Sequence, residues 1–301
     1  MKSVKPAINS GSDKLVSFDI DHTLIDTFGA VVPAWRESMP IVADRLGISM
    51  TEACARMSEV IGKHLTQDYP WWLAHAFHPV WKGTVAQFVE QVESPFWDRQ
   101  DRYMETHLRP YPEVIPTFTE FKKHSVKIVL VSDATYYITL ARLCKTGLSQ
   151  YVDGVYALDV KREPESVPSE EWLEFGDRRM RTIEKEYEKH FSLCRKLPES
   201  WAKPKPHGIK LACTDFSVAP GDVYHVGDSL GKDVVLAANA GLKGAMWLPD
   251  HAVATLPPED REWINKKLAH PSVLWAVPSE VVPELQGSLG DLVGLVLGSG
   301  C

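Results

Sequence analysis

The sequence predicts a three-layer α/β protein, in which a mostly parallel β-sheet lies between helices and a helical unit is inserted after the first strand. Two observations support this fold class. Short apolar runs typical of buried parallel strands alternate with helical patterns along the chain. A long stretch after the first of these runs is helical in pattern and rich in aromatic residues, without a convincing strand.

Five apolar runs have the length of strands and the continuous hydrophobicity of strands that are buried on both faces. They are LVSF at 15–18, KIVLVS at 127–132, VYHV at 223–226, GAMWL at 244–248 and VLWAV at 273–277. Because parallel strands need crossover connections, we expect helices between them, on both faces of the sheet.

Two helical patterns lie between these runs. Residues 112–124 place Ile115, Phe118 and Phe121 on one stripe, which we expect to face the core. Residues 234–240 are rich in alanine and end before a glycine, as helices often do.

The long helical stretch divides the chain into two expected domains. Residues 1–27 and 105–301 would form the α/β core, with 1–13 frayed, and residues 28–104 would form a helical domain. We expect most of its tryptophans to pack in its interior, with one or two facing a ligand. The tryptophans concerned are Trp35, Trp71, Trp72, Trp81 and Trp97.

Residues 161–200 form a second insertion, highly charged, in which apolar side chains follow helical spacing. The members of this stripe are Met180, Ile183, Tyr187, Phe191 and Cys194. We interpret the segment as an amphipathic helix lying on the core, and keep a dimer contact or a wall of the active-site mouth as alternatives.

Amino-acid composition limits the classes of protein and partner to which this chain can belong. Hydrophobic residues make up 44% of the 301 residues and charged residues 24%, as in ordinary globular proteins. The net charge of -7 gives no basic footprint for nucleic acid, and no run has the length of a membrane span. Five scattered cysteines without a CxxC pair indicate reduced thiols. We therefore expect a cytoplasmic monomer or homodimer without nucleic-acid or membrane partners.

Acidic residues gather where predicted strands end. Asp19 and Asp21 follow the first strand, and Asp228 follows VYHV, with Asp233 shortly after. In open parallel sheets, ligands bind beyond the carboxyl ends of the strands. A single carboxylate there is often a helix N-cap, but several anions at one sheet edge are costly unless a cation neutralises them. Oxygen ligands and a nearby phosphate suit Mg²⁺ best.

The motifs around these carboxylates resemble those of the haloacid dehalogenase-like superfamily. FDIDHTLID resembles its DxDx[T/V] signature, and VLVSDAT its second motif, in which a Ser or Thr closes a strand. AKPKPHGI is similar to its lysine motif, and VYHVGDSLGKDVVLAANAG to its fourth motif. The motifs occur in the family's order over residues 12–28 and 105–250. The resemblance implies a Rossmann-like core with a helical cap, here at 28–104, and a phosphatase activity.

The resemblance also implies catalytic roles. Asp19 would be the nucleophile that forms an aspartyl-phosphate, and Asp21 would protonate the leaving oxygen and then activate water. Their spacing suits this, because alternate residues of an extended chain point to the same side. Ser132 and Lys203 would bind the phosphoryl oxygens, and Asp133 would lie beside them at the phosphate site.

The implied metal is Mg²⁺, held by Asp19, the backbone carbonyl of Asp21, and Asp228, with Asp233 either a ligand or a support. The substrate would be a small phosphorylated metabolite, selected by the cap. Lys205 is a rival for the lysine role, although the spacing favours Lys203.

Further residues near the motifs carry expectations of their own. Thr23 is expected to order the turn after the nucleophile. His22 stands where many relatives have glycine, and either points into the site or packs beside it. His75 and His78 form an HxxH pair without a third ligand, so we assign no zinc site there.

Three alternatives to a phosphatase remain open at this point. A dehalogenase needs neither a metal nor an acid at position 21. A phosphomutase needs a cap group that protects the intermediate from water, and none is recognisable. A non-catalytic phosphate-binding protein would not need the complete set of Asp19, Asp21, Ser132, Lys203 and Asp228.

Overall fold

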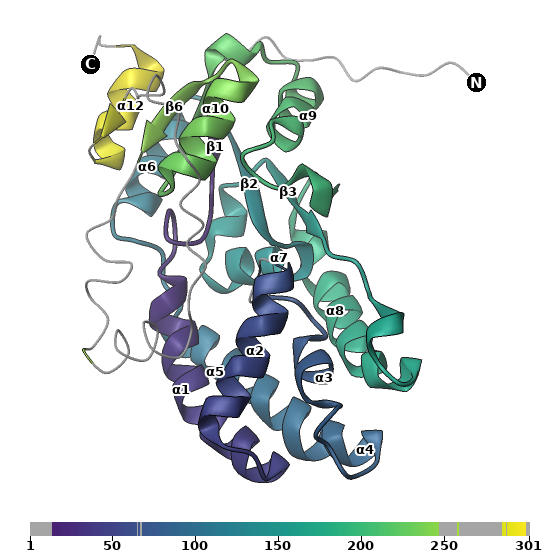
Figure 1. Cartoon of the computed structure of the whole chain (residues 1–301). Coiled ribbons are helices and arrows are strands. Elements are labelled where there is room, and N and C mark those ends of the chain that lie inside the picture. Colours follow the sequence, from purple (N-terminus) through teal and green to yellow (C-terminus); the bar gives the residue numbers. More distant parts are fainter. Residues whose placement is uncertain are drawn as a thin grey trace.

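The computed structural model describes residues 14–64, 66, 68–246, 258, 285–286 and 288–298. These residues form two lobes, an α/β core and a helical cap (Figure 1). The three-layer α/β prediction with an inserted cap is confirmed. The frayed start at 1–13, the strand at 273–277 and Cys301 lie outside the described residues.

The sheet of the core is entirely parallel. Its order is β4-β3-β2-β1-β5-β6-β7. The strands are β1 Leu15–Phe18, β2 Lys127–Thr135, β3 Gly154–Asp159, β4 Cys194–Pro198, β5 Val223–Gly227, β6 Lys243–Met246 and β7 Leu285–Gln286. The first three predicted strands are confirmed as β1, β2 and β5, and the fourth is confirmed as β6 over its described residues, 244–246. Strands β3 and β4 were not predicted.

Side chains of β1 alternate between the two faces of the sheet, as strand geometry requires. Val16 and Phe18 pack into one buried cluster with α6 and α7, whereas Leu15 packs into the cluster on the opposite face with α9 and α10. Both faces of β1 are therefore buried, which explains why its sequence is a continuous apolar run.

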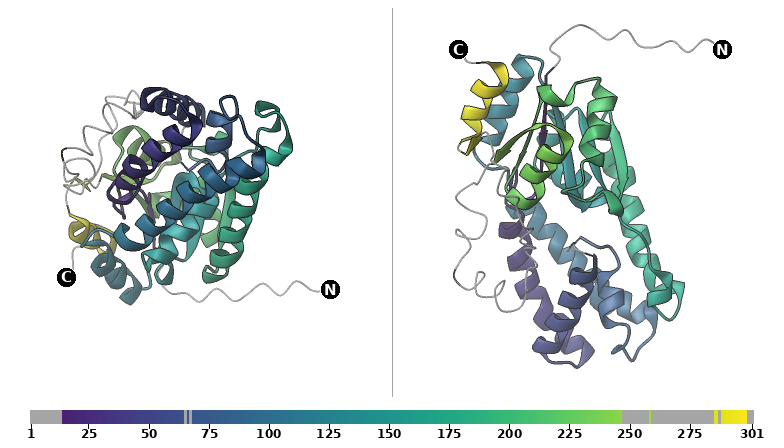
Figure 2. Two further views of the ribbon diagram at one scale, coloured as in Figure 1. Left: turned by 90° about the horizontal axis from the view of Figure 1, so that it is seen from below. Right: turned by 45° about the horizontal axis from the view of Figure 1, so that its top comes forward.

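Helices cover both faces of the sheet (Figures 1 and 2). The core helices are α6 Val114–Lys123, α7 Tyr136–Lys145, α8 Glu174–Tyr187, α9 His207–Phe216, α10 Val235–Ala240 and α12 Leu289–Leu297. Among the described residues, no helix has both the length and the apolar character needed to cross a membrane.

The predicted stripe of α6 is correct in part. Phe118 and Phe121 are fully buried, but Ile115 is 38% exposed. Val114 takes the expected place, because it lies four residues before Phe118 and seven before Phe121, which puts all three on one helix face.

The insertion at 161–200 is only partly helical. Helix α8 ends at Tyr187, and Cys194 begins the strand β4, so the predicted helical stripe was wrong at its end. Met180, Ile183 and Tyr187 pack against the core cluster, as expected for an amphipathic helix lying on the core, and Met180 also packs against the cap cluster. Strand β4 carries exposed Arg195 and Lys196, as the edge of a sheet often does.

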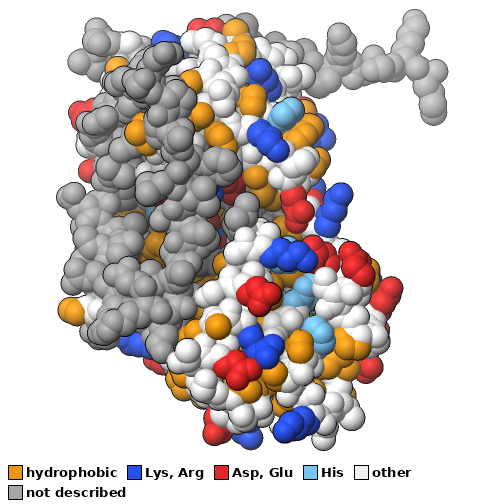
Figure 3. Space-filling model, viewed as in Figure 1, with side chains coloured by type: hydrophobic (Ala, Val, Ile, Leu, Met, Phe, Trp, Pro, Cys, Tyr) orange, Lys and Arg blue, Asp and Glu red, His pale blue; other side chains and the backbone are white. Residues whose placement is uncertain are grey.

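The cap is built from helices and lies beyond the carboxyl ends of the strands (Figure 2, right). Its helices are α1 Thr27–Leu46, α2 Met50–His64, α3 Trp72–Phe77, α4 Val85–Phe88, the π-helix η1 Val89–Glu93, and α5 Ser94–His107. Figure 3 shows a notch between cap and core on one side, with acidic and basic side chains at its rim.

The expected packing role of the cap tryptophans is confirmed. Trp35, Trp71, Trp72 and Trp97 are buried in one cluster, and Trp81 packs against it. Trp172 and Leu173, which precede α8, complete the same cluster. The insertion therefore belongs to the interior of the cap as well as to the surface of the core.

Glu93 is an exception inside this apolar cap. Its side chain is almost completely buried, and neither carboxylate oxygen has a hydrogen-bond partner among the described residues. Burial raises the pKa of Glu93 to about 8, although Arg178 opposes the shift. The folded protein therefore holds a proton there at neutral pH.

We expect the stability of the cap to fall as pH rises, because of Glu93. The pKa of Glu93 is higher in the folded than in the unfolded protein, so between about pH 4.5 and 8 only the folded state keeps the proton. The free energy of unfolding therefore falls by up to about 5 kcal/mol as the pH rises across this range. Urea unfolding at several pH values should show that the free energy of unfolding decreases with pH, and Glu93→Gln should remove most of this decrease. Glu90→Gln, an exposed control in the same π-helix, should keep it; an equal slope in both variants would contradict the assignment.

Candidate active site

Three carboxylates converge beyond the ends of two neighbouring strands. Asp19 follows β1, Asp228 follows β5, and Asp233 lies in the π-helix η8 (Leu230–Val234). Strands β1 and β5 pair in parallel with Phe18 opposite Val226, which brings their ends together. One oxygen from each carboxylate lies within 4.8 Å of the others. The sequence predicted that Asp19, Asp21, Asp228 and Asp233 would gather here; the structure brings three of them together and leaves Asp21 outside the group.

Lys203 lies among these acids. Its Nζ is 2.5 Å from Asp19 Oδ1 and 2.7 Å from Asp233 Oδ1, and its side chain is almost completely buried. Lys205, the rival in the same loop, donates instead to the backbone oxygen of Ser200 and is exposed. The geometry therefore distinguishes the two lysines, and it places Lys203 beside the expected nucleophile.

Gly227 allows Asp233 to approach the end of β5. A Cβ built on Gly227 would lie 2.1 Å from the carboxyl carbon of Asp233. No side chain fits at that separation, so glycine is required here for close approach. Asp233 Oδ2 also accepts from the backbone N–H of Ser229, at 3.1 Å.

His225 extends the cluster inward, and sequence reasoning missed it. Its Nε2 lies 3.2 Å from Asp233 Oδ1, and its Nδ1 lies 3.0 Å from the Ser17 hydroxyl oxygen. With an ionised Asp233, Nε2 must donate, so Nδ1 accepts from Ser17. The sequence signal that could have identified His225 was the presence of one polar residue in each of two apolar strands, Ser17 and His225. The two residues lie opposite each other in the sheet.

Burial and charge shift these groups in different directions. Burial raises the pKa of Asp19 well above its ordinary value, and it raises that of Asp228 to about 6. Burial also acts on Asp233, but Lys203 and His225 outweigh it and lower the pKa. Burial lowers the pKa of His225, which is therefore neutral. When all three acids are ionised, they carry more negative charge than Lys203 offsets.

Asp21 is held outside this cluster by two donors. One oxygen accepts from the Thr27 hydroxyl, at the start of α1, and the other from Arg142 Nη1 at 2.8 Å. Arg142 lies in α7 and is 1% exposed. Both donors lie where the core meets the cap, so the position of Asp21 depends on that junction.

Arg142 also binds Asp68 of the cap. Its two terminal nitrogens donate to the two Asp68 oxygens at 2.9 and 2.8 Å, a bidentate pair. Asp68 lies between α2 and α3, and its backbone oxygen accepts from the Tyr137 hydroxyl at 2.9 Å. Arg142 thus links the cap to Asp21. Nothing in the local sequence identified Arg142 or Asp68, because their meeting depends on packing between the lobes.

Ser132 and Asp133 end β2 near the lysine loop. Ser132 is buried, and its oxygen accepts from the backbone N–H of Ala134 at 3.1 Å. Asp133 Oδ1 accepts from the backbone N–H of Lys203 at 2.9 Å, and Oδ2 from Lys232 at 3.2 Å. The Asp133 carboxylate therefore fixes the backbone of the loop that carries Lys203, and Lys232 balances its charge.

Two residues beside the nucleophile have structural partners. His22 has a φ of 64°, the left-handed region that glycine prefers, and its ring stacks on Phe28 at 3.9 Å. This favours the packed position over one inside the site. Thr23 donates to Asp228 Oδ1 at 3.2 Å, so it ties the turn after β1 to the acid that follows β5.

We expect Arg142→Lys to lower turnover by about 10²-fold, because lysine cannot hold Asp21 and bidentate Asp68 together and small displacements of reacting groups are costly. Steady-state kinetics over a range of pH should show a loss in kcat with an altered acid limb. Arg195→Lys is a control, since Arg195 makes a bidentate pair with Asp215 at the exposed edge strand β4. An equal loss of kcat in both variants would mean that Arg142 acts only through stability.

Comparison with protein families identifies relatives of this chain. A family model for haloacid dehalogenase-like hydrolases matches residues 14–171, and a related HAD-hydrolase-like model matches residues 200–252. The chain is similar to N-acylneuraminate-9-phosphatase of Homo sapiens, with 22% identity over 283 residues, which cover 89% of this chain and 96% of the relative.

Solved structures share the fold. The chain resembles a HAD phosphatase from Thermococcus onnurineus with a TM-score of 0.55 and 20% identity, covering 95% of this chain and 98% of that one. It also resembles a putative beta-phosphoglucomutase from Thermotoga maritima, with a TM-score of 0.51, 17% identity and coverages of 94% and 98%. At these identities the likeness establishes the fold, and the two structures differ in their described activities.

Proposed function

The chain belongs to the haloacid dehalogenase-like hydrolases, and we propose that it is a Mg²⁺-dependent phosphatase that hydrolyses a small phosphomonoester through an aspartyl-phosphate. The observation that carries the proposal is the position of Lys203, within 2.7 Å of both Asp19 and Asp233. A buried ammonium beside the expected nucleophile can bind an incoming phosphoryl group.

The acid cluster fits Mg²⁺. Asp19, Asp228 and Asp233 bring three carboxylates to one place, and the single ammonium of Lys203 offsets one of them. Because His225 is neutral, two negative charges remain when all three acids ionise, which a divalent cation would balance. Asp19, the backbone carbonyl of Asp21 and Asp228 would hold the ion, which when bound would neutralise charge on the phosphate.

Asp233 would support the site without binding the metal directly. Lys203 and His225 already contact its Oδ1, and the backbone of Ser229 contacts its Oδ2. These donors use both carboxylate oxygens. Of the two roles that the sequence left open for Asp233, the hydrogen bonds favour holding Lys203 in place.

The proposed reaction has two steps. In the first, Asp19 attacks phosphorus, the bond to the leaving oxygen breaks, and Asp21 gives that oxygen a proton. In the second, Asp21 takes a proton from water, which attacks the same phosphorus and releases phosphate from Asp19. Ser132, Lys203 and the loop that Asp133 holds would contact the phosphoryl oxygens throughout.

The helical cap would cover the rest of the substrate and exclude water. The similarity to N-acylneuraminate-9-phosphatase over most of both chains makes phosphorylated sugar acids the first substrates to examine. We further propose a cytoplasmic location, since no disulfide joins the four described cysteines (Cys54, Cys144, Cys194 and Cys213), as expected in a reducing compartment.

The test is phosphate release from an aryl phosphate and from a panel of phosphorylated sugars, sugar acids and nucleotides. We expect activity that chelation by EDTA abolishes and that added Mg²⁺ restores, because the carboxylates repel the substrate when no cation is bound. Full activity in EDTA would contradict the role of the metal.

The same preparation distinguishes the alternatives. Halide release from a 2-haloacid without metal would identify a dehalogenase, and isomerisation of a hexose phosphate without phosphate release would identify a mutase. Phosphate binding without turnover of any phosphomonoester would identify a binding protein. Each of these outcomes would overturn the proposed hydrolysis.

A further inference from the structure

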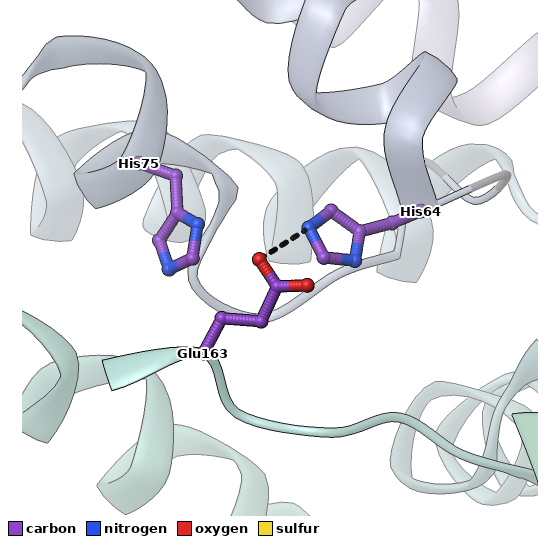
Figure 4. A group of neighbouring side chains, drawn as sticks. All are labelled: His64, His75 and Glu163. Atoms are coloured by element: carbon purple, nitrogen blue, oxygen red, sulfur yellow. Dashed lines mark ion pairs between the residues drawn. The ribbon is translucent and has the colours of Figure 1, made fainter. Parts of the chain in front are cut away.

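Three potential metal ligands from separate segments meet at the edge of the cap (Figure 4). His64 ends α2, His75 lies in α3, and Glu163 lies in the segment that leaves β3. One nitrogen of each imidazole and one Glu163 oxygen lie within 4.8 Å of one another, and His64 Nε2 is 3.8 Å from Glu163 Oε2. In Figure 4 the Glu163 carboxylate lies between the two rings.

Two ring nitrogens of this group lack the hydrogen bonds that buried polar atoms usually make. Nε2 of His64 and Nε2 of His75 are both buried, and neither has a hydrogen-bond partner among the described residues. Leaving such atoms unpaired is costly. His64 Nε2 faces the Glu163 carboxylate (Figure 4), so a ligand bound there would satisfy this nitrogen.

The two imidazoles are in the form that binds metals. Burial lowers the pKa of His64, and burial followed by the charge of His64 lowers the pKa of His75 to about 4. Both rings are therefore neutral at physiological pH and offer a lone pair. The Glu163 carboxylate adds an oxygen ligand, and its pKa lies below the ordinary value despite burial, because of Lys63 and His64.

We propose that His64, His75 and Glu163 bind a Zn²⁺ ion that ties the cap to the segment following β3. Two imidazoles and one carboxylate form a ligand set typical of zinc, with a fourth position left for water. Ligand atoms at zinc-bond lengths of about 2.1 Å in a tetrahedron lie about 3.4 Å apart. Small side-chain rotations close the separations found here, which do not exceed 4.8 Å.

Lys63 is the competitor for this site. Its Nζ lies 2.5 Å from Glu163 Oε2, but its side chain is 57% exposed. An exposed lysine pair contributes little free energy, and the side chain can move into solvent when a metal binds. The neighbouring His78 is not a competitor, since its Nδ1 lies 3.1 Å from the backbone oxygen of Ala74.

The proposed site is not the HxxH pair, to which the sequence assigned no zinc. His75 and His78 do not act together; the partners of His75 are His64 and Glu163, which lie far apart in the sequence. The zinc site is separate from the carboxylates around Asp19, which offer only oxygen ligands suited to Mg²⁺. It therefore does not depend on the proposed phosphatase activity.

The test uses the full chain loaded with Zn²⁺ and dialysed, with zinc measured by atomic emission. We expect one bound zinc per chain, a rise in melting temperature on zinc addition, and with Co²⁺ a visible absorption band typical of a four-coordinate site. His64→Gln, His75→Gln and Glu163→Gln should each weaken zinc binding by about 100-fold, as for loss of a strong ligand contact.

Two matched controls identify the site. His78→Gln should keep the zinc and the cobalt band, and so should Asp228→Asn, which alters the core acids. Lys63→Met should tighten zinc binding by up to about five-fold, because it removes the competing ammonium. Zinc lost in Asp228→Asn but kept in His75→Gln, or no zinc retained by the wild-type chain, would overturn the proposal.

Discussion

Asp19→Asn is expected to abolish phosphate release, with kcat reduced by about 10⁴-fold or more, as for other catalytic nucleophiles. The amide keeps the shape of the carboxylate but cannot attack phosphorus. The fold should persist, because Lys203 keeps its contact with Asp233 at 2.7 Å. Circular dichroism and steady-state kinetics together measure both parts of this result.

A direct probe of the intermediate sharpens this prediction. Acid quenching of wild-type enzyme during turnover of a radiolabelled phosphate ester should leave label on the protein, and the Asp19→Asn variant should carry none. Asp44→Asn is a suitable control, since Asp44 is exposed on α1. Turnover of Asp19→Asn comparable to that of the control would show that another residue is the nucleophile.

Lys203→Met is expected to impair both stability and catalysis. The buried ammonium contacts Asp19 and Asp233, so its removal leaves two buried carboxylates without a cation. Breaking a buried pair in this way costs about 3–5 kcal/mol of unfolding free energy. Loss of the ammonium at the phosphoryl group should lower kcat by about 10³-fold.

Urea unfolding with and without Mg²⁺ measures the loss of stability in Lys203→Met, and phosphate release measures the loss of kcat. Mg²⁺ should recover part of the lost stability, because it offers the carboxylates another cation. Lys205→Met is the matched control, in the same loop but exposed, and should change stability by less than about 0.5 kcal/mol. Equal losses in the two variants would contradict the distinction between the lysines.

The local sequence was sufficient to predict elements whose hydrophobic pattern does not depend on which segments cover them. LVSF is apolar throughout because β1 is covered on both faces, and the predicted strand and the observed strand coincide. The acids at the ends of β1 and β5 could be grouped in advance, because parallel strands place their carboxyl ends at one edge of the sheet. The helical cap followed from a long stretch without strand patterns.

Periodicity failed where a segment contacts two different surroundings. Phe191 and Cys194 lie beyond the end of α8 but keep its spacing and pack against the same core cluster, so Cys194 was read as helical although it begins β4. Ile115 was placed on the buried stripe of α6 because side-chain spacing alone does not identify which face meets the sheet. Both errors arose because hydrophobic spacing alone fixes neither which helix face is buried nor where a helix gives way to a strand.

The sequence by itself determined the fold class, the family motifs and the order of the acids along the chain. Only the tertiary structure decided that His225 lies behind Asp233, that Arg142 links Asp21 to Asp68, and that Glu163 meets two cap histidines. The physical reason is that strand ends and core stripes follow from local patterns, whereas side-chain contacts depend on how the chain packs in three dimensions, above all where the partners lie far apart in sequence.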